Sequence, residues 1–239
     1  MYPRYTVAAR MKMVETKQQE SEESMMFRHF HSTSRVLGVA FILALGSCVS
    51  LRAQDRMPPI PADKLTEAQR TAAAEFRAAR NAEPSGPFGV LLRVPDLMTL
   101  GFKWREHVQF RSALDQRLTE FAILIAARQW TQQYEWNAHY PAALKAGLKP
   151  EIVAAVAEGR LPAHMADDEE VLYEFCSELH RNQSVSDATY ARALAKFGES
   201  GIVEAASIEG YYTLLAMVMN AARTPLPAGA KAPLAAFPR

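Results

Sequence analysis

Cysteine is scarce in this 239-residue chain, which contains only Cys48 and Cys176. We place Cys48 in an export signal, so the folded region keeps one thiol and cannot form an intrachain disulfide. The histidines and carboxylates form no His-Glu-x-x-His motif and the cysteines form no Cys-x-x-Cys motif, so we expect no metal site. A Gly-rich phosphate loop and a dinucleotide fingerprint are also absent, and we expect no cofactor.

The chain also lacks an excess of charge of either sign. Lys and Arg total 27 against 26 for Asp and Glu, which leaves a formal charge of +1 and no basic stripe. This balance argues against a nucleic-acid partner. Alternating strand patterns and sequence repeats are missing as well, and the 49% hydrophobic content can fill one sizeable core. The sequence therefore predicts a single all-α domain.

The only long apolar run near the N-terminus spans residues 36–45, with a basic lead before it and small residues after it. This arrangement is typical of an export signal, which we place at residues 25–53. Met25 and Met26 stand just before the basic lead, so residues 1–24 are interpreted as a spurious or disordered extension. The alternative is a genuine N-terminal extension with an internal anchor.

Two cleavage sites fit the end of this signal. The run Leu45-Gly46-Ser47-Cys48 resembles a lipoprotein box that would leave a lipidated Cys48, whereas Leu51-Arg52-Ala53 before Gln54 fits ordinary cleavage. Either reading predicts an exported protein, periplasmic or secreted. Membrane contact would then occur only through the signal or the lipid anchor.

The mature chain divides into a linker at 54–65, a helical domain at 66–227 and a loose tail at 228–239. The linker is stiffened by prolines, and Thr66 is a candidate N-cap for the first helix. Residues 84–87 are expected to form a turn. Apolar spacing, caps and helix-stop glycines predict helices at about 67–80, 95–111, 114–130, 132–146, 151–158, 167–181, 187–197 and 201–223. Two of these, 118–127 and the last, are apolar on most faces and predict oligomerisation.

The most informative stretch is residues 117–147. It places Glu120 inside an otherwise apolar helix, and the next helix carries Glu135 and His139 four residues apart. Because such residues share a helix face, Glu135 can orient the imidazole of His139. A desolvated carboxylate facing this pair could move protons. Two simpler readings stay open: a surface pair of Glu135 with His139, and an ion pair of Glu120 with Arg117 one turn earlier.

Several neighbouring side chains could surround a ligand. Trp130, Tyr134 and Trp136 would provide apolar walls, although aromatic residues more often belong to the core. Arg128 and Arg111 are candidates to hold a substrate carboxylate, or they are solvated.

Residues 87–227 resemble the carboxymuconolactone decarboxylase family, which includes the alkylhydroperoxidase D-like proteins. Residues 117–147 form the most specific block, and the motifs that support it are Gly86-Pro87-Phe88, Pro95-Asp96-Leu97, Gly210-Tyr211-Tyr212, Asn220 and Pro225-Leu226-Pro227. The resemblance implies a single-domain orthogonal helical bundle of the alkylhydroperoxidase D-like type. It also implies a homo-oligomer, either a trimer or a hexamer.

The peroxidase branch of this family has a Glu, a Cys-x-x-Cys pair and a His at fixed intervals. Here the Glu and His positions fall on Glu120 and His139, but the cysteine positions hold Gln132 and Glu135. Neither residue can supply the thiolate that dithiol peroxide reduction needs. The resemblance therefore implies the lactone-decarboxylase side of the family, with Glu120, Glu135 and His139 catalytic and with substrate bound by Gln132, Trp136, Trp130, Tyr134 and Arg128.

The predicted function is cofactor-free acid–base chemistry, decarboxylation or proton transfer, on a small carboxylated or lactone-like molecule. Two alternatives remain. One is peroxidase activity of the alkylhydroperoxidase D kind, which the missing cysteines disfavour, and the other is a non-catalytic ligand-binding protein.

Overall fold

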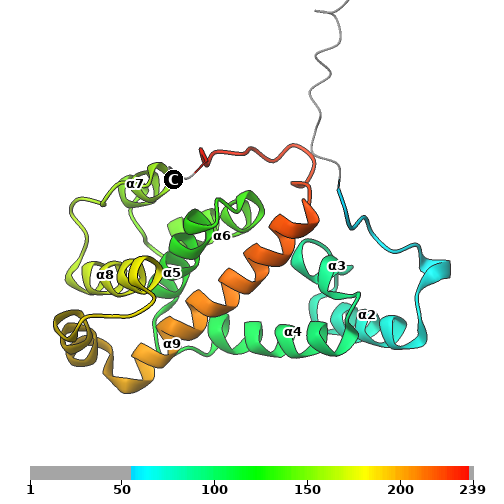
Figure 1. The fold of residues 1–239 in the computed structure, drawn as a ribbon, viewed down its shortest axis with the longest axis horizontal. Coiled ribbons are helices and arrows are strands. Elements are labelled where there is room, and N and C mark those ends of the chain that lie inside the picture. Colours follow the sequence, from blue (N-terminus) through cyan, green and yellow to red (C-terminus); the bar gives the residue numbers. More distant parts are fainter. Residues whose placement is uncertain (1–54, 237–239) are drawn as a thin grey trace, which may run out of the picture. The chain divides into compact units, whose positions relative to one another are not determined.

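The computed structural model describes residues 55–236, and this part of the chain contains helices and no strands (Figure 1). The predicted extension, the export signal and Cys48 lie outside the described residues. The elements are η1 (Ala62–Lys64), α2 (Glu67–Arg80), α3 (Pro87–Leu91), α4 (Pro95–Phe110), α5 (Gln116–Gln129), α6 (Gln133–Lys145), α7 (Pro150–Glu158), α8 (Asp167–Asn182) and α9 (Asp187–Ala222). The predicted all-α class is confirmed.

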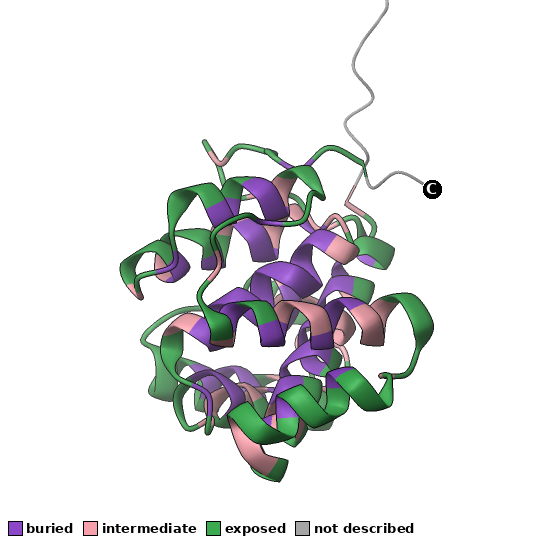
Figure 2. Ribbon diagram, turned by 90° about the vertical axis from the view of Figure 1, so that its left-hand side faces the viewer, coloured by how far each residue is buried: buried purple, intermediate pink, exposed green. Residues whose placement is uncertain are grey.

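Helix α5 forms the centre of the bundle. All of its residues from Leu118 to Arg128 are buried, and it contacts α4, α6, α7, α8 and α9. Its start is fixed by Asp115, whose carboxylate accepts a 2.9 Å hydrogen bond from the backbone N–H of Leu118. Figure 2 shows this buried centre in purple, surrounded by helices with exposed outer faces. A polar side chain in this part of α5 therefore lies in the core. A ligand can approach it only through a hollow in the surface.

Helix α9 is the longest element and crosses the bundle between α4 and α5 (Figure 1). Its backbone leaves the helical region at Gly198, with φ 67° and ψ 178°, so the two predicted helices are joined across a kink. This positive φ suits glycine, which has no Cβ to clash. By length and composition α9 could cross a membrane, but a core helix passes the same test.

The helix starts follow the predicted caps, with one omission. Thr66 and Gln69 form a capping box at the start of α2. Residues 84–87 were expected to form only a turn, yet α3 begins at Pro87, where proline is tolerated because the first N–H has no helical partner. The preceding Gly86 has φ 55°, and a Cβ there would lie 2.5 Å from the ring of Tyr134. Glycine is thus required for this turn to pack against α6.

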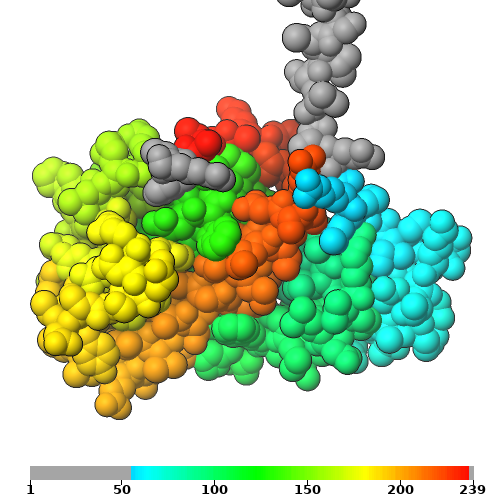
Figure 3. Space-filling view, viewed as in Figure 1, coloured from blue at the N-terminus to red at the C-terminus, as the bar shows by residue number. Residues whose placement is uncertain are grey.

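The C-terminal segment packs on the bundle instead of hanging loose. Leu234 is buried, its N–H donates to Gln133, and its carbonyl accepts from the Gln133 side chain at 2.6 Å. The Asn137 amide donates to Lys231 O, and Arg128 donates to Ala235 O at 2.8 Å. Figure 3 shows this segment, in red, lying against α6 in green. The prediction of a loose tail did not include these polar contacts, because Leu234 is the single buried apolar residue in the described positions 228–236.

Candidate functional site

The core of the candidate site is a contact between Glu120 on α5 and His139 on α6. Nδ1 of His139 lies 2.7 Å from Oε2 of Glu120, and the two side chains are 8% and 1% exposed. A hydrogen bond to a carboxylate in a desolvated setting is short and strong, and it fixes the orientation of the imidazole. The structure therefore brings together the two residues on which the predicted chemistry depends.

Two glutamines hold the other oxygen of Glu120. The side-chain amide of Gln116, one turn earlier on α5, donates to Oε1 at 2.9 Å, and that of Gln109 on α4 donates at 3.4 Å. Amide donors stabilise a carboxylate without removing its charge. Oε1 of Gln109 is buried and has no hydrogen-bond partner among residues 55–236, so this acceptor is not used within the described part of the chain.

Glu135 lies on the far side of the same imidazole. Its Oε2 is 3.5 Å from Nε2 of His139, and its Oε1 is buried with no hydrogen-bond partner in the part of the chain that the structure describes. Burial raises the pKa of Glu135, and the neighbouring charge of Glu120 adds to this, while His139 and Arg105 act against it. A carboxyl group with a raised pKa retains its proton more readily. The imidazole of His139 thus lies between two carboxyl groups, Glu120 and Glu135, in different environments.

Both simpler readings of these residues can now be judged. Glu135 and His139 are buried, so they are not a surface helix pair. Arg117 does not bind Glu120: its guanidinium donates to Glu169 and Asp168, each at 2.6 Å, and ties α5 to α8. The geometry leaves Glu120 paired with the imidazole.

Sequence reasoning missed the aromatic and cationic groups behind His139. The ring of Tyr212 meets the imidazole edge-on with centroids 5.0 Å apart, and Tyr211 packs on Tyr212 at 5.2 Å. Both hydroxyls are buried and have no hydrogen-bond partner among the described residues. Burial and the charge of Glu135 raise the pKa of each phenol. Arg105 acts against these shifts. The family block at 210–212 was the only signal for the tyrosines.

A surface hollow of about 520 Å³ reaches Glu120, and we call it the Glu120 hollow. Gln109 and Gln116, whose amides bind Oε1 of Glu120, line it as well, and 1% of the Glu120 side chain is exposed. His139 and Glu135 are not among its lining residues. The hollow is further lined by Phe110, Asp115, Arg117, Ala142, Lys145 and Ala146.

The predicted substrate-binding residues lie elsewhere, and their contact with substrate stays a prediction. Gln132 caps α6 and donates to Asn220 at 2.8 Å, and Trp130, 36% exposed, donates to Thr213. Trp136 is in the hydrophobic core, and Tyr134 lines a different hollow. Arg128 holds the C-terminal segment. None of these five residues lines the Glu120 hollow. The hollow opens near the start of α5, whereas the five residues lie at the end of α5 and at the start of α6.

Comparison with protein families matches residues 95–173 to the Carboxymuconolactone decarboxylase family. The matched segment includes Glu120, Glu135 and His139. The comparison with curated proteins finds no match.

Solved structures share the fold. An uncharacterized peroxidase-related protein from Ralstonia eutropha JMP134, described as an alkylhydroperoxidase AhpD core, superposes with a TM-score of 0.60 at 17% identity, covering 72% of this chain and 92% of that one. A peroxidase-related protein from Silicibacter sp. TM1040 gives 0.60 at 14% identity, with 74% and 94% covered. A cysteine-to-alanine variant of the debrominase Bmp8, in complex with 2,3,4-tribromopyrrole, gives 0.58 at 13% identity, with 76% and 95% covered. At these identities the likeness concerns the fold.

Proposed function

Residues 95–173 belong to the carboxymuconolactone decarboxylase family, and from this premise we propose cofactor-free proton transfer on a small carboxylated or lactone-like molecule. Glu120, His139 and Glu135 would be the catalytic groups. The observation that supports this most is the buried 2.7 Å contact between Glu120 and His139, placed where a surface hollow reaches the carboxylate. Decarboxylation of a carboxylated lactone is the specific reaction that we put forward.

The proposed reaction requires a proton at carbon. When the bond to the carboxyl group breaks, CO2 leaves and the electron pair remains on a carbon conjugated to the lactone carbonyl. That carbon must then be protonated, and a positioned acid accelerates such a step by about 10²–10⁴-fold. Glu120 is the group that faces the hollow, so it would deliver the proton and recover it from His139 through the Oε2 to Nδ1 contact.

Glu135 would act as the proton reserve. Its raised pKa favours the protonated form, and it lies 3.5 Å from the second nitrogen of the imidazole. A proton that moves from Glu135 to Nε2 while another leaves Nδ1 for Glu120 would restore the acid at the hollow. The two carboxyl groups thus take different roles because their surroundings differ.

The rim of the Glu120 hollow would orient the substrate. Lys145 lies at this rim, and its ammonium can hold a substrate carboxylate as a point charge. The amides of Gln116 and Gln109, which already reach Glu120 Oε1, are placed to bind a carbonyl oxygen beside the acid. These residues differ from the predicted arginine, Arg128.

A screen of the purified protein against lactones, dicarboxylates and hydroperoxides tests the proposal. We expect turnover on a carboxylated lactone and its loss in His139→Ala. Turnover of hydroperoxides with a thiol reductant would instead support peroxidase activity. Binding without turnover, unchanged in His139→Ala, would support a non-catalytic ligand-binding protein.

Peroxidase activity is disfavoured by the chemistry of the available thiol. Gln132 and Glu135 occupy the two cysteine positions, and the free cysteine in the described region, Cys176, is buried. Burial and the neighbouring Glu209 raise its pKa well above the ordinary value. A thiol with a raised pKa is a poor nucleophile at neutral pH.

We also propose a homo-oligomer, exported as the N-terminal pattern predicts. The proposal is supported by exposed apolar side chains on two adjoining helices: Leu100 and Trp104 on α4, and Val203 and Met217 on α9. In Figure 3 the orange α9 crosses the visible face with no helix over it. Light scattering of the purified protein and mass spectrometry of the mature chain test the two parts separately.

A further inference from the structure

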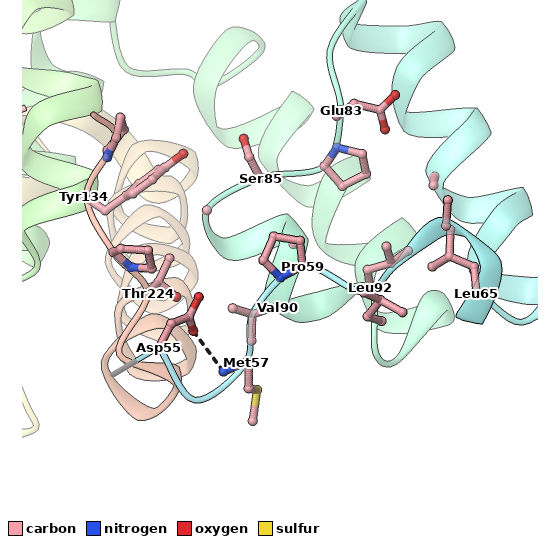
Figure 4. Close-up of a pocket in the computed structure, with 18 of the residues that line it drawn as sticks. Asp55, Met57, Pro59, Leu65, Glu83, Ser85, Val90, Leu92, Tyr134 and Thr224 are labelled. Atoms are coloured by element: carbon pink, nitrogen blue, oxygen red, sulfur yellow. Dashed lines mark hydrogen bonds between the residues drawn. The ribbon is translucent and has the colours of Figure 1, made fainter. Parts of the chain in front are cut away.

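A larger hollow, of about 700 Å³, lies away from Glu120, and we call it the linker hollow. Figure 4 shows its walls: the linker, the segment that leads into α3, and the segment after α9 that begins at Thr224. Its lining residues fall between 55 and 92 and between 224 and 227, apart from Tyr134. The hollow is therefore built almost wholly outside the family-matched residues 95–173, and it is a separate feature of this chain.

The start of the linker is tied down beside the hollow. The N–H of Arg56 donates to Ala222 O at 2.8 Å, at the end of α9. The guanidinium of Arg93, which follows α3, donates to Pro58 O at 2.7 Å. Prolines next to these points restrict the backbone further. These contacts fix residues 56–58 next to the lining residues Pro59 and Ile60.

The lining is chiefly aliphatic. Ile60 and Leu65 come from the linker side, Val90 and Leu92 from α3 and the residue after it, and Leu226 from the C-terminal segment. Pockets of roughly 300–1,000 Å³ with such walls bury most of the surface of a drug-sized organic molecule. The shape and lining thus suit an apolar organic molecule.

Charges on the lining disfavour an anionic ligand. Asp55 and Glu83 carry two negative charges, and the cation among the lining residues, Arg77, already pairs with Glu83 at 3.1 Å. Asp55 accepts a 2.9 Å hydrogen bond from the N–H of Met57, drawn as the dashed line in Figure 4. An acid entering the hollow would meet Asp55 with no uncommitted lining cation to offset it.

One buried polar atom of a lining residue lacks a partner among the described residues. Oγ1 of Thr224 is buried and makes no hydrogen bond with residues 55–236. A buried hydroxyl without a partner costs free energy that a ligand oxygen can recover. Figure 4 places Thr224 on the same wall as Tyr134 and Asp55. The Thr224 hydroxyl thus offers a ligand oxygen a neutral hydrogen-bonding group beside the aliphatic lining.

We propose that the linker hollow binds a neutral, largely apolar organic molecule that carries one carbonyl or hydroxyl oxygen, and that Thr224 binds this oxygen. The proposal rests on the volume, the aliphatic lining, the negative charge balance and the buried Thr224 hydroxyl. It does not depend on the chemistry at Glu120.

Fluorescence titration of the full chain with N-phenylnaphthylamine, a neutral apolar dye, tests the site. We expect saturable binding, and at least tenfold weaker binding of anilinonaphthalene sulfonate, which adds a negative charge to the same ring system. Val90→Trp fills the hollow and should weaken binding of the neutral dye at least tenfold. The control Leu161→Trp, at an exposed site between α7 and α8 that lines neither hollow, should change it less than twofold.

Thr224→Val provides a second test if Val90→Trp does not fold. Nile red carries a carbonyl oxygen, and losing its hydrogen bond should weaken binding about three- to tenfold. The control Thr99→Val lies outside the hollow and should leave the affinity unchanged. Equal effects of the two Trp variants, equal affinity for the sulfonated dye, or no saturable binding to the full chain would each overturn the proposal.

Discussion

In the described part of the chain, two glutamates that are almost fully buried each lie less than 3 Å from a histidine. Glu120 and His139 are 2.7 Å apart between α5 and α6, and Glu209 and His180 are 2.6 Å apart between α9 and α8. Both glutamates are almost fully buried, at 1% and 2% exposed side chain. The distance and the burial therefore do not tell the two apart.

The surroundings of the two Glu–His pairs distinguish them. Glu120 faces a hollow of about 520 Å³, and the far nitrogen of His139 meets a second carboxyl group. Glu209 instead neighbours the Cys176 thiol, whose pKa it helps to raise, and it lines neither described hollow. A buried pair becomes a candidate for catalysis when a substrate can reach it and when a further group can replace the proton. Without both, it holds two helices together.

Matched substitutions in the two glutamates should separate these roles most strongly. Glu120→Gln keeps the size and hydrogen bonding of the side chain but cannot transfer a proton. On the substrate that the screen identifies, we expect kcat to fall by about 10²–10⁴-fold. Glu209→Gln should leave kcat within about twofold. A comparable loss of kcat in both variants, with both folded, would contradict the assigned difference.

The structural pair should reveal itself in stability. His180→Ala removes the partner of Glu209 and leaves a buried carboxylate uncompensated, which we expect to lower the free energy of unfolding by about 2–4 kcal/mol. Urea denaturation measures this value. Replacing Glu209 as well, by Leu, should recover part of the loss; no recovery would mean that the pair is not the cause.

Arg117 links α5, which carries Glu120, to Asp168 and Glu169 of α8. Burial alone would raise the pKa of Asp168, but the hydrogen bond and charge of Arg117 lower it on balance. Arg117→Met should cost about 1–2 kcal/mol at neutral pH. Because a lowered pKa stabilises the fold above the ordinary Asp value, the difference from wild type should shrink as the pH falls through the folded-state pKa. If the difference in free energy of unfolding between Arg117→Met and wild type stays constant as the pH falls, the result would argue against this ion pair.

The smallest effect is expected at Glu135. Its pKa is raised in the folded state, so folding favours the protonated form and stability falls as the pH rises above the ordinary Glu value. Glu135→Gln removes this titration and should flatten the curve of stability against pH, by no more than about 1 kcal/mol near pH 8. Thermal melts across the pH range measure it. A wild-type stability that increases with pH above the ordinary Glu pKa would contradict the raised pKa of Glu135.

The sequence predicted the helices well because their ends carry local signals. Thr66 caps α2 as predicted, and the side chains of Asp115 and Ser186 cap α5 and α9. The short α3 was missed because Pro84–Pro87 reads as a turn, and its packing depends on Tyr134 from a distant helix. Signals within a few residues are readable from the sequence, whereas contacts between helices are not.

The candidate site was only partly predictable for the same reason. Glu120, Glu135 and His139 stand out as polar residues in apolar helices, and the spacing of the latter two fixes their shared face. The Gln109 and Gln116 contacts and the second pair depend on how α4, α8 and α9 are placed. His180 lies in the last turn of α8, where its place in the sequence suggests only an interaction with the helix dipole. Its true partner lies 29 residues away on α9.

Proton exchange at carbon tests the central claim most directly. A lactone with an exchangeable hydrogen next to its carbonyl is incubated with the protein in D2O, and deuterium incorporation is followed by NMR. If Glu120 transfers protons at the hollow, the wild type and Glu209→Gln will catalyse incorporation, and Glu120→Gln will not. Incorporation by Glu120→Gln at the wild-type rate would contradict the assignment of the buried Glu120–His139 pair as the catalytic one.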